Sequence, residues 1–444
     1  MSKKPRHVYS VEGTLAPMLF DPELEPEARN LFELACCGSR ELWPSLASGI
    51  SAADPALRDT FYALANKGMF EAQQIIVNKL TSSEPVKQSA KVLYRAVCDA
   101  MAWQFLGHQL CHARRLYKGH EQPSLTENNL SSLLLAVEQL RKSSPHAMPL
   151  ISDLTSFVQV GDIFLSDPKK GFSFIEVKEG RENARIMDLV RFYRESGCEQ
   201  FREIISSTES KHVAKQFERN IRQYGRMDHI AEIMNKGDSV DPDTGNRHFI
   251  PEDEIETATW DGELNAVIDE ARSKGWALQV IDGGLFVACY VEENFRRAGH
   301  VLFNSWLDRF GGDARSPRST LIQAMAVPLA LPLFNRGLAP DTVFDIMFGR
   351  MQVCMGVSVP AFLERCVRAG MGTRPATRKE RGELMKPGAG AVLFEDKPVF
   401  LSRGDAEMPL LDGIFFRSLF HGQKPISLIE TYLNHLPSLD PTAR

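Results

Sequence analysis

The hydrophobic pattern of the chain changes period near residue 154, and this change restricts the fold more than any other feature. Residues 22–145 carry apolar side chains at the three-and-four spacing of amphipathic helices. Residues 154–165 are instead rich in Val, Phe, Thr and Ile, and residues 172–177 follow after the turn-forming cluster 166–171. This arrangement predicts a β-hairpin in a largely helical protein. We therefore expect an α/β (α+β) fold.

Further elements follow the hairpin. Helical periodicity returns at residues 184–195 and 211–236, and the acidic stretch 237–262 is typical of a solvated loop or linker. Asp282-Gly283-Gly284 joins two strand-like runs, 277–281 and 285–291, and predicts a second hairpin. The last 150 residues are again helical in pattern, with one more hairpin at 391–394 and 398–401.

Chain length and local helix signals set the expected domain boundaries. A chain of 444 residues is long enough for two or three domains. The pattern Ser124-Leu125-Thr126-Glu127 is a helix-capping motif ahead of an apolar helical run over residues 130–140. We expect a helical N-terminal domain over residues 1–125, an α/β core with a helical insertion over 126–295, and a mostly helical domain over 296–444.

Composition excludes several protein classes. The 52 Lys and Arg residues against 57 Asp and Glu residues give a net charge of −5, which excludes a globally basic nucleic-acid coat but allows a local basic groove. Eight cysteines without a CxxC pair indicate free thiols in a reducing compartment. The longest apolar stretch, 321–334, is too short to cross a bilayer. These observations predict a soluble, cytoplasmic protein without a membrane partner.

The first hairpin carries the residues of chemical interest. Side chains alternate faces along a strand, so Glu176 and Lys178 point one way while Ile175 and Val177 point into the core. A three-residue loop would place Asp162 opposite Glu176 or Lys178. Two carboxylates that close repel each other unless a cation or a proton lies between them. Mg²⁺ (or Mn²⁺) suits such a site, because it needs only one or two carboxylates and completes its shell with water and phosphate oxygens.

Asp162, followed after 13 residues by Glu176-Val177-Lys178, closely resembles the motif of the PD-(D/E)XK nuclease superfamily, which includes restriction endonucleases. The resemblance implies that Asp162 and Glu176 are metal ligands together with the Val177 carbonyl, and that Asp162, Glu176 and Lys178 are the catalytic residues. The superfamily often adds an acidic residue from a preceding helix, for which Glu138 is the candidate. Gly161 stands where the eponymous motif has proline.

The same resemblance implies a restriction-endonuclease-like mixed β-sheet core of α-β-β-β-α-β order, flanked by a helical N-terminal domain and an α+β C-terminal domain. Such a core requires another strand after the helix 184–195, and the run 277–291 is the expected source. The implied activity is Mg²⁺-dependent endonucleolytic hydrolysis of DNA. By analogy with the superfamily we expect a role in bacterial anti-phage defence, with a second copy or another defence protein as partner.

A basic stripe supports a nucleic-acid substrate. On a helix over residues 211–236, Lys215, Arg219, Arg222 and Arg226 fall on one side, and an apolar seam covers the other. Such a stripe can follow a phosphate backbone, although a solvated helix face gives the same pattern. Gln216 and Gln223 flank the stripe and could reach base edges or sugars.

Two alternatives stay open. The core can be a degenerate, non-catalytic copy that serves as a nucleic-acid-binding or assembly subunit. RNA can replace DNA as the substrate, because both would use the same site.

Overall fold

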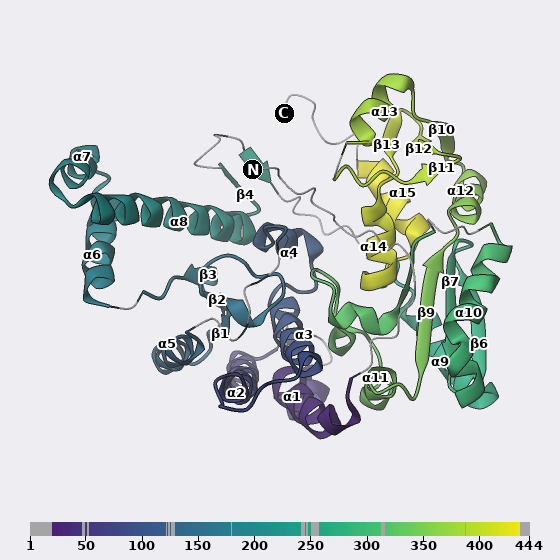
Figure 1. The fold of residues 1–444 in the computed structure, drawn as a ribbon, viewed down its shortest axis with the longest axis horizontal. Coiled ribbons are helices and arrows are strands. Elements are labelled where there is room, and N and C mark those ends of the chain that lie inside the picture. The colour runs from purple at the N-terminus through teal and green to yellow at the C-terminus, as the bar shows by residue number, and fades with distance from the viewer. Residues whose placement is uncertain are drawn as a thin grey trace. The chain divides into compact units, whose positions relative to one another are not determined.

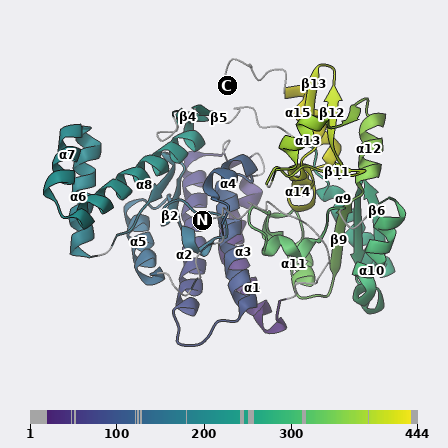
Figure 2. The ribbon, with the colours of Figure 1, turned by 45° about the horizontal axis from the view of Figure 1, so that its top comes forward.

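The computed structural model describes residues 20–46, 49–50, 53–120, 122, 125, 129–178, 180–240, 245, 247–249, 257–311, 316–386 and 388–435. The chain divides into two compact units (Figures 1 and 2). The N-terminal unit consists of Asn30–Lys87 and Tyr94–Asp253. The C-terminal unit consists of Met1–Arg29, Gln88–Leu93 and Glu254–Arg444. Both units mix helices with small antiparallel sheets, so the protein is α+β.

Helices form most of the N-terminal unit. They are α2 (Pro55–Leu80), α4 (Leu110–Leu116), α5 (Leu130–Ser143), α6 (Arg181–Ser196), α7 (Glu199–Thr208) and α8 (Lys211–Lys236), with short 3-10 turns η2 (Arg40–Leu46) and η4 (Ser152–Leu154). Helices α1 (Glu25–Cys37) and α3 (Gln88–Phe105) also belong to this unit, except for their first residues, Glu25–Arg29 and Gln88–Leu93, which belong to the C-terminal unit. The predicted helix over 211–236 is confirmed at both ends. Ser210 caps α8 by accepting a hydrogen bond from the Val213 backbone N–H, and Gly237 ends it in the left-handed conformation.

A three-stranded antiparallel sheet lies within this unit in the order β1 (Met148–Ile151), β2 (Ile163–Asp167), β3 (Gly171–Ile175). The predicted hairpin is confirmed, and so is its three-residue loop, because Asp167 pairs with Gly171. Strand β1, whose sequence is Met-Pro-Leu-Ile, was not predicted. Helices α2 and α5 pack against β1, and α8 packs against β3.

The first predicted strand was placed too early, because β2 begins at Ile163 rather than at residue 154. The preceding segment is buried but irregular, and side chains from elsewhere satisfy its backbone. Asp99 accepts a hydrogen bond from the Ser156 N–H, and Gln122 donates to the Val158 carbonyl. The apolar composition therefore reflects burial of a loop rather than a strand.

Helices α6 and α7 pack on the first half of α8 (Figures 1 and 2). Their shared core contains Ile186, Val190, Ile205, Val213 and Phe217. The stretch 237–262, predicted to be a loop, contains the short antiparallel pair β4 (Asp238–Val240) and β5 (Arg247–Phe249). Most of its other residues, and the capping residues Ser124, Thr126 and Glu127, lie outside the described part of the chain.

The C-terminal unit is built on an antiparallel sheet in the order β6 (Trp276–Ile281), β7 (Leu285–Tyr290), β9 (Gln352–Val357), β8 (Arg318–Thr320). The predicted hairpin over 277–291 is confirmed, but its predicted place in the sheet of Asp162 is wrong. All six residues of β7 are buried, and this strand pairs with β6 on one side and with β9 on the other. Every strand pair in the described residues is antiparallel, and the expected mixed sheet is not found among them.

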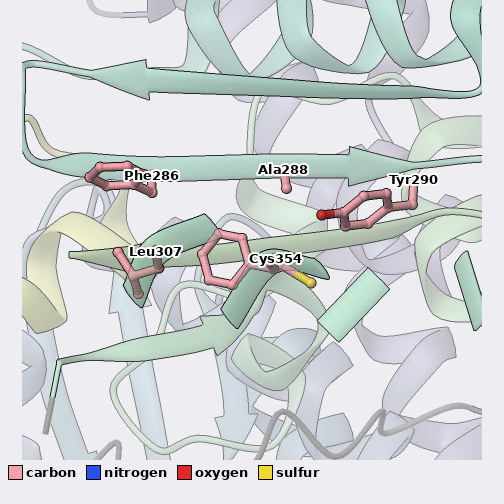
Figure 3. Close-up of a cluster of buried hydrophobic side chains, with 6 residues drawn as sticks. Phe286, Ala288, Tyr290, Leu307 and Cys354 are labelled. Atoms are coloured by element: carbon pink, nitrogen blue, oxygen red, sulfur yellow. The ribbon is translucent and has the colours of Figure 1, made fainter. Parts of the chain in front are cut away.

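Helices α9 (Asp261–Lys274) and α10 (Glu293–Arg309) cover this sheet. Tyr290 and Ala288 of β7 pack with Phe303 of α10, whereas the intervening Cys289 interacts with Arg272 of α9. Because successive strand residues face opposite sides, the two helices lie on opposite faces of the sheet. Figure 3 shows the cluster on the α10 side.

The rest of the C-terminal unit, predicted to be mostly helical, also contains strands. Its helices are η1 (Pro22–Leu24), η5 (Leu321–Met325), η6 (Leu333–Asn335), α11 (Pro340–Met347), α12 (Val359–Arg368), α13 (Arg378–Leu384), α14 (Asp412–His421) and α15 (Pro425–His435). A second antiparallel sheet joins β10 (Gly372–Pro375), β12 (Lys397–Arg403) and β11 (Leu393–Phe394), with β13 (Ala406–Pro409) beside β12. The pair β11–β12 is the predicted third hairpin.

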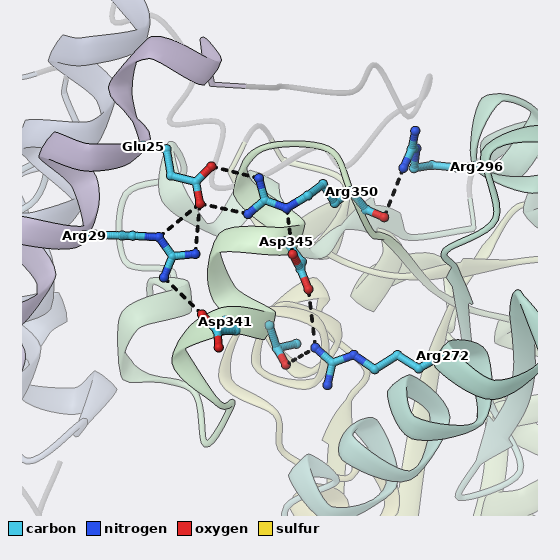
Figure 4. A network of polar contacts seen from close by, with 8 residues as sticks. Glu25, Arg29, Arg272, Arg296, Asp341, Asp345 and Arg350 are labelled. Carbon is cyan, nitrogen blue, oxygen red and sulfur yellow. Dashed lines mark hydrogen bonds and ion pairs between the residues drawn. The ribbon is translucent and has the colours of Figure 1, made fainter.

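An ion-pair network fixes the first turn of α1 within the C-terminal unit (Figure 4). The Glu25 carboxylate accepts hydrogen bonds from Arg29 and Arg350, and Arg350 also donates to Asp345. These hydrogen bonds lower the pKa of Glu25 below its usual range, Arg350 contributing most. Arg350, which lies between α11 and β9, thus binds Glu25 at the start of α1.

All eight cysteines are free thiols, as predicted. Within the described residues, no helix is both long enough and apolar enough to span a bilayer.

Candidate active site

The β2–β3 hairpin brings Asp162 to the segment that contains Glu176. The paired register of the two strands ends with Ile163 opposite Ile175. Just beyond it, the Asp162 N–H donates to the Ile175 carbonyl and the Val177 N–H donates to Asp162 Oδ2, at 2.9 and 2.7 Å. The Asp162 carboxylate therefore lies beside residues 175–177 and within electrostatic reach of Glu176.

Gly161 makes this geometry accessible. Its φ is +67°, and a Cβ atom at this position would lie 3.1 Å from Phe174 Cβ and 3.2 Å from the Ile175 carbonyl oxygen. A side chain would therefore be strained and crowded immediately before Asp162. The positive φ and the close contacts with Phe174 and Ile175 therefore explain why glycine precedes Asp162.

Glu176 and Lys178 contact each other directly. Lys178 Nζ lies 2.5 Å from Glu176 Oε1, and only 5% of the Glu176 side chain is exposed, against 24% for Lys178. A carboxylate this deeply buried requires charged or hydrogen-bonding partners. Lys178 is one such partner and forms the more accessible side of the pair.

Helix α8 supplies the second partner of Glu176. Gln223 Nε2 donates to Glu176 Oε2 at 2.5 Å. Sequence reasoning placed Gln223 beside the basic stripe as a nucleic-acid contact and missed this role. Glutamine is uncharged and has no motif spacing relative to Glu176, so no local signal pointed to the contact.

Helix α8 runs along β3 in antiparallel sense. Near the C-terminal end of the helix, the Asn235 side chain accepts from the Phe172 N–H at 2.7 Å and donates to the Phe172 carbonyl at 2.8 Å. Twelve residues earlier, Gln223 reaches Glu176, just past the end of β3. The helix is therefore fastened to the strand at both ends of the strand, which positions Gln223 at the carboxylates.

The surroundings of Asp162 disfavour the ionised form of its carboxyl group. Burial and the Glu176 carboxylate raise the pKa of Asp162 to about 6, although the hydrogen bond from Val177 and the Lys178 charge oppose the shift. Burial, with a further contribution from Glu176, also raises the pKa of Asp153. A bound cation would offset this repulsion, and two carboxylates form a sufficient protein ligand set for Mg²⁺.

Further side chains surround the carboxylates. Burial and the Arg226 charge lower the pKa of Lys118, while Glu176 opposes this shift. Burial, followed by the Glu176 charge, raises the pKa of Tyr224. Lys118, Tyr224 and Arg226 are therefore electrostatic neighbours of the site that the sequence did not identify as such, apart from Arg226 in its stripe.

The basic stripe of α8 reaches solvent at all four of its positions, Lys215, Arg219, Arg222 and Arg226. Val213, Phe217 and Met227 on the other side of the helix are buried, as the apolar seam predicted. Arg222 is adjacent to Gln223, so the stripe runs past the Glu176 site. The stripe thus lies on the helix that contacts Glu176, which directly follows β3.

Glu138, the predicted third acidic ligand, forms its ion pair within its own helix. It sits on α5, pairs with Lys142 at 2.9 Å and leaves 42% of its side chain exposed. This ion pair, with the charge of Lys142, lowers the pKa of Glu138. Within the described part of the chain, no three His, Cys, Asp or Glu side chains are close enough together to hold a metal ion. The structure thus brings Asp162 and Glu176 together without Glu138.

A cavity of about 610 Å³ borders the site at Tyr224. Helices α6 and α8 form its walls through Met187, Val190, Arg191, Arg194, Glu195, Tyr224 and Asp228. Arg194 pairs with Asp228 and lies over the Tyr224 ring, 4.7 Å from the ring centroid. Tyr224 therefore belongs both to the wall of this open space and to the electrostatic surroundings of Glu176.

Comparisons with protein-family models, with curated proteins and with solved structures find no match to this chain.

Proposed function

We propose that the protein is a metal-dependent endonuclease that hydrolyses phosphodiester bonds of DNA. The observation that carries this proposal is the arrangement of Asp162, Glu176 and Lys178 at the end of the β2–β3 hairpin. Asp162 accepts a hydrogen bond from the Val177 N–H, next to Glu176, and Lys178 Nζ contacts Glu176. Burial, followed by repulsion from Glu176, raises the pKa of Asp162, and such a shift is expected of a buried carboxylate next to a second one with which it could share a cation.

The order of elements supports a restriction-endonuclease-like core. Helix α5, strands β1 to β3 and helix α6 follow one another in the α-β-β-β-α order that the superfamily motif implies. A further strand beside β1–β3 is absent from the described residues. We propose a reduced form of the core, in which α8 covers β3 and contributes Gln223 to the site.

In the proposed reaction, Asp162 and Glu176 would hold Mg²⁺ with the Val177 carbonyl. When bound, Mg²⁺ supplies Lewis-acid activation of the phosphodiester and of the attacking water. Lys178 orients that water and stabilises negative charge that develops on the phosphate oxygens. Gln223 and Lys178 fix the Glu176 carboxylate in one orientation, so that the ligand oxygens are arranged before the metal binds.

The stripe cations of α8 are proposed to bind the DNA backbone. Lys215, Arg219, Arg222 and Arg226 reach solvent on the helix that also carries Gln223. Phosphate contacts along this helix would set the position of the duplex relative to the carboxylates.

The test is cleavage of supercoiled plasmid with Mg²⁺ or Mn²⁺ by the full chain and by Glu176→Gln and Lys178→Met. We expect metal-dependent cutting by the wild type, abolition by EDTA, and a decrease of at least about 100-fold in each variant, the size typical of removing an acid–base or ligand group. Glu138→Gln serves as the matched carboxylate control and is expected to retain activity. Cutting that survives in Glu176→Gln would contradict the proposed site.

A second candidate function, a nucleic-acid-binding subunit with an inactive core, is favoured by one observation. Both oxygens of Glu176 already accept hydrogen bonds, from Lys178 and from Gln223. DNA or RNA binding in a gel-shift assay, without cleavage of plasmid, linear DNA or RNA under any divalent metal, would support this second function. RNA cleavage without DNA cleavage would retain the site and change the substrate.

A further inference from the structure

Three buried polar atoms lie on one face of the C-terminal sheet without a hydrogen-bond partner. They are Tyr290 Oη, Thr320 Oγ1 and Gln352 Oε1, from strands β7, β8 and β9. Tyr290 and Thr320 are each only 2% exposed. An unsatisfied buried polar group destabilises the folded state, because it gives up its hydrogen bonds to water without replacing them, so three on one face require an explanation.

The sheet register brings these groups together. Tyr290 pairs directly with Gln352, and Thr320 pairs with Cys354, two residues further along β9 on the same face. Helix α10 covers this face, and Gly299 of this helix packs against Gln352 and Tyr290. A Cβ atom on Gly299 would lie 2.4 Å from Gln352 Oε1 and 2.6 Å from the Tyr290 ring, so glycine is needed here. Figure 3 shows Tyr290 among the side chains of this face.

Thr320 and Gln352 line a cavity of about 210 Å³. Apolar side chains of Ile322, Ile346, Met351 and Val353 form other parts of its wall, and α10 contributes Arg296, Arg297 and His300. The described lining contains basic side chains and no Asp or Glu. The cavity therefore suits a ligand that is neutral and hydrogen-bonding at one end and anionic at the other.

The wall around the cavity is braced by the network of Figure 4. Arg296 Nη1 donates to the Arg350 carbonyl at 3.1 Å, and the Arg350 guanidinium is held by Glu25 and Asp345. Arg350 stands between Gly349 and Met351, which both line the cavity. This bracing holds Arg296 and the start of β9 in place without a ligand, as in a preformed site.

We propose that this cavity binds a nucleoside monophosphate. A base with an N–H donor would satisfy Gln352 Oε1, its apolar faces would contact Ile322 and Ile346, and the phosphate would lie beside the basic residues of α10. The volume is close to that of one nucleoside, and the absence of acidic residues from the described lining disfavours amines and metal cations. This site is independent of the proposed nuclease activity.

Isothermal titration of the full chain with AMP, adenosine and inorganic phosphate tests the proposal. We expect AMP to bind at least 10-fold more tightly than either fragment, because only AMP engages both ends of the cavity. Absence of AMP binding up to millimolar concentration would overturn the proposal and leave the cavity as a site for ordered water. Phosphate binding as tight as AMP binding would also overturn it, in favour of a simple anion site.

Two near-isosteric variants separate ligand binding from stability. Thr320→Val and Gln352→Met remove the unsatisfied atoms of the cavity lining, so each should weaken AMP binding about 10-fold while leaving the ligand-free Tm unchanged or higher. Ser319→Ala is the matched control, because the Ser319 hydroxyl donates to Gln323 and the residue alternates to the other face of β8. AMP affinity that is unchanged in both Thr320→Val and Gln352→Met would place binding elsewhere and overturn the assignment.

Discussion

The backbone N–H of Val177 donates to Asp162 Oδ2 at 2.7 Å. This bond joins the residue between Glu176 and Lys178 to the carboxylate opposite them, so backbone and side chains define one site. It also stabilises the charged form of Asp162, yet burial and Glu176 outweigh it and hold the pKa of Asp162 at about 6. The two carboxylates therefore repel each other, and a cation would relieve the repulsion.

Divalent metal should stabilise the protein through this pair. The pKa of Asp162 in the folded chain exceeds its ordinary value of 3.8, so its ionisation destabilises the fold progressively as pH rises from about 4 to about 6. At pH 7.5, saturating Mg²⁺ should raise Tm by about 2–6 °C in a thermal melt of the wild type.

Asp162→Asn provides the control for the metal effect. This variant should be more stable than the wild type without metal by about 1–2 kcal/mol, after allowance for solvent screening, and should no longer respond to Mg²⁺. An equal Tm increase with Mg²⁺ in wild type and variant would show that the metal binds at another place.

Gln223 should act as a positioning residue. Replacement by Leu removes the donor to Glu176 Oε2 and should raise the Mg²⁺ concentration for half-maximal cleavage by about 10–100-fold, the usual effect of removing an outer partner of a metal ligand. The maximal cleavage rate at saturating Mg²⁺ should change by a smaller factor than this Mg²⁺ concentration. Gln216→Leu on the same helix is the matched control, and an identical metal dependence in the two variants would argue against positioning by Gln223.

The α8 stripe should determine salt-dependent DNA binding. Simultaneous replacement of Lys215, Arg219, Arg222 and Arg226 by Ala should reduce the slope of log K against log salt by about 0.9 for each phosphate that the stripe neutralises in the wild type. Fluorescence anisotropy over a salt series measures this slope. Lys67→Ala, an exposed position on α2, is the control, and an unchanged slope in the quadruple variant would assign DNA binding to another surface.

Asp99 should make stability depend on pH. Burial raises the pKa of Asp99 to about 7, against the hydrogen bond from the Ser156 N–H that favours its ionised form. Since the folded pKa lies above the unfolded one, the wild type should become less stable relative to Asp99→Asn by about 2–4 kcal/mol as pH rises from about 4 to about 7. Urea unfolding at several pH values measures the difference in the free energy of unfolding between wild type and variant. If this difference did not change with pH, the pKa of Asp99 would be the same in the folded and unfolded chains, and the prediction would be wrong.

Local sequence patterns determined the elements that carry the site. Helix α8 was predicted at both ends, because its helical periodicity and its apolar seam are local signals. The turn residues between β2 and β3 predicted the pairing of these strands, because antiparallel register follows from loop length. The prediction that Ile175 and Val177 face the core while Glu176 faces outward was wrong, because the Glu176 side chain is only 5% exposed and the two apolar residues are partly exposed.

Tertiary structure alone decided which segments met. Burial in a strand and burial in a loop leave the same apolar composition, so residues 154–162 resembled a strand, while Asp99 and Gln122 in fact satisfy their backbone. The hairpin β6–β7 has the same local pattern whichever sheet it joins, and its pairing with β9 became evident only in the fold. Gln223 meets Glu176, 47 residues away, through the packing of α8 on β3, a contact that no periodicity encodes. The sequence thus determined helix α8 and the β2–β3 hairpin through short-range geometry, whereas long-range packing determined the surroundings of the site.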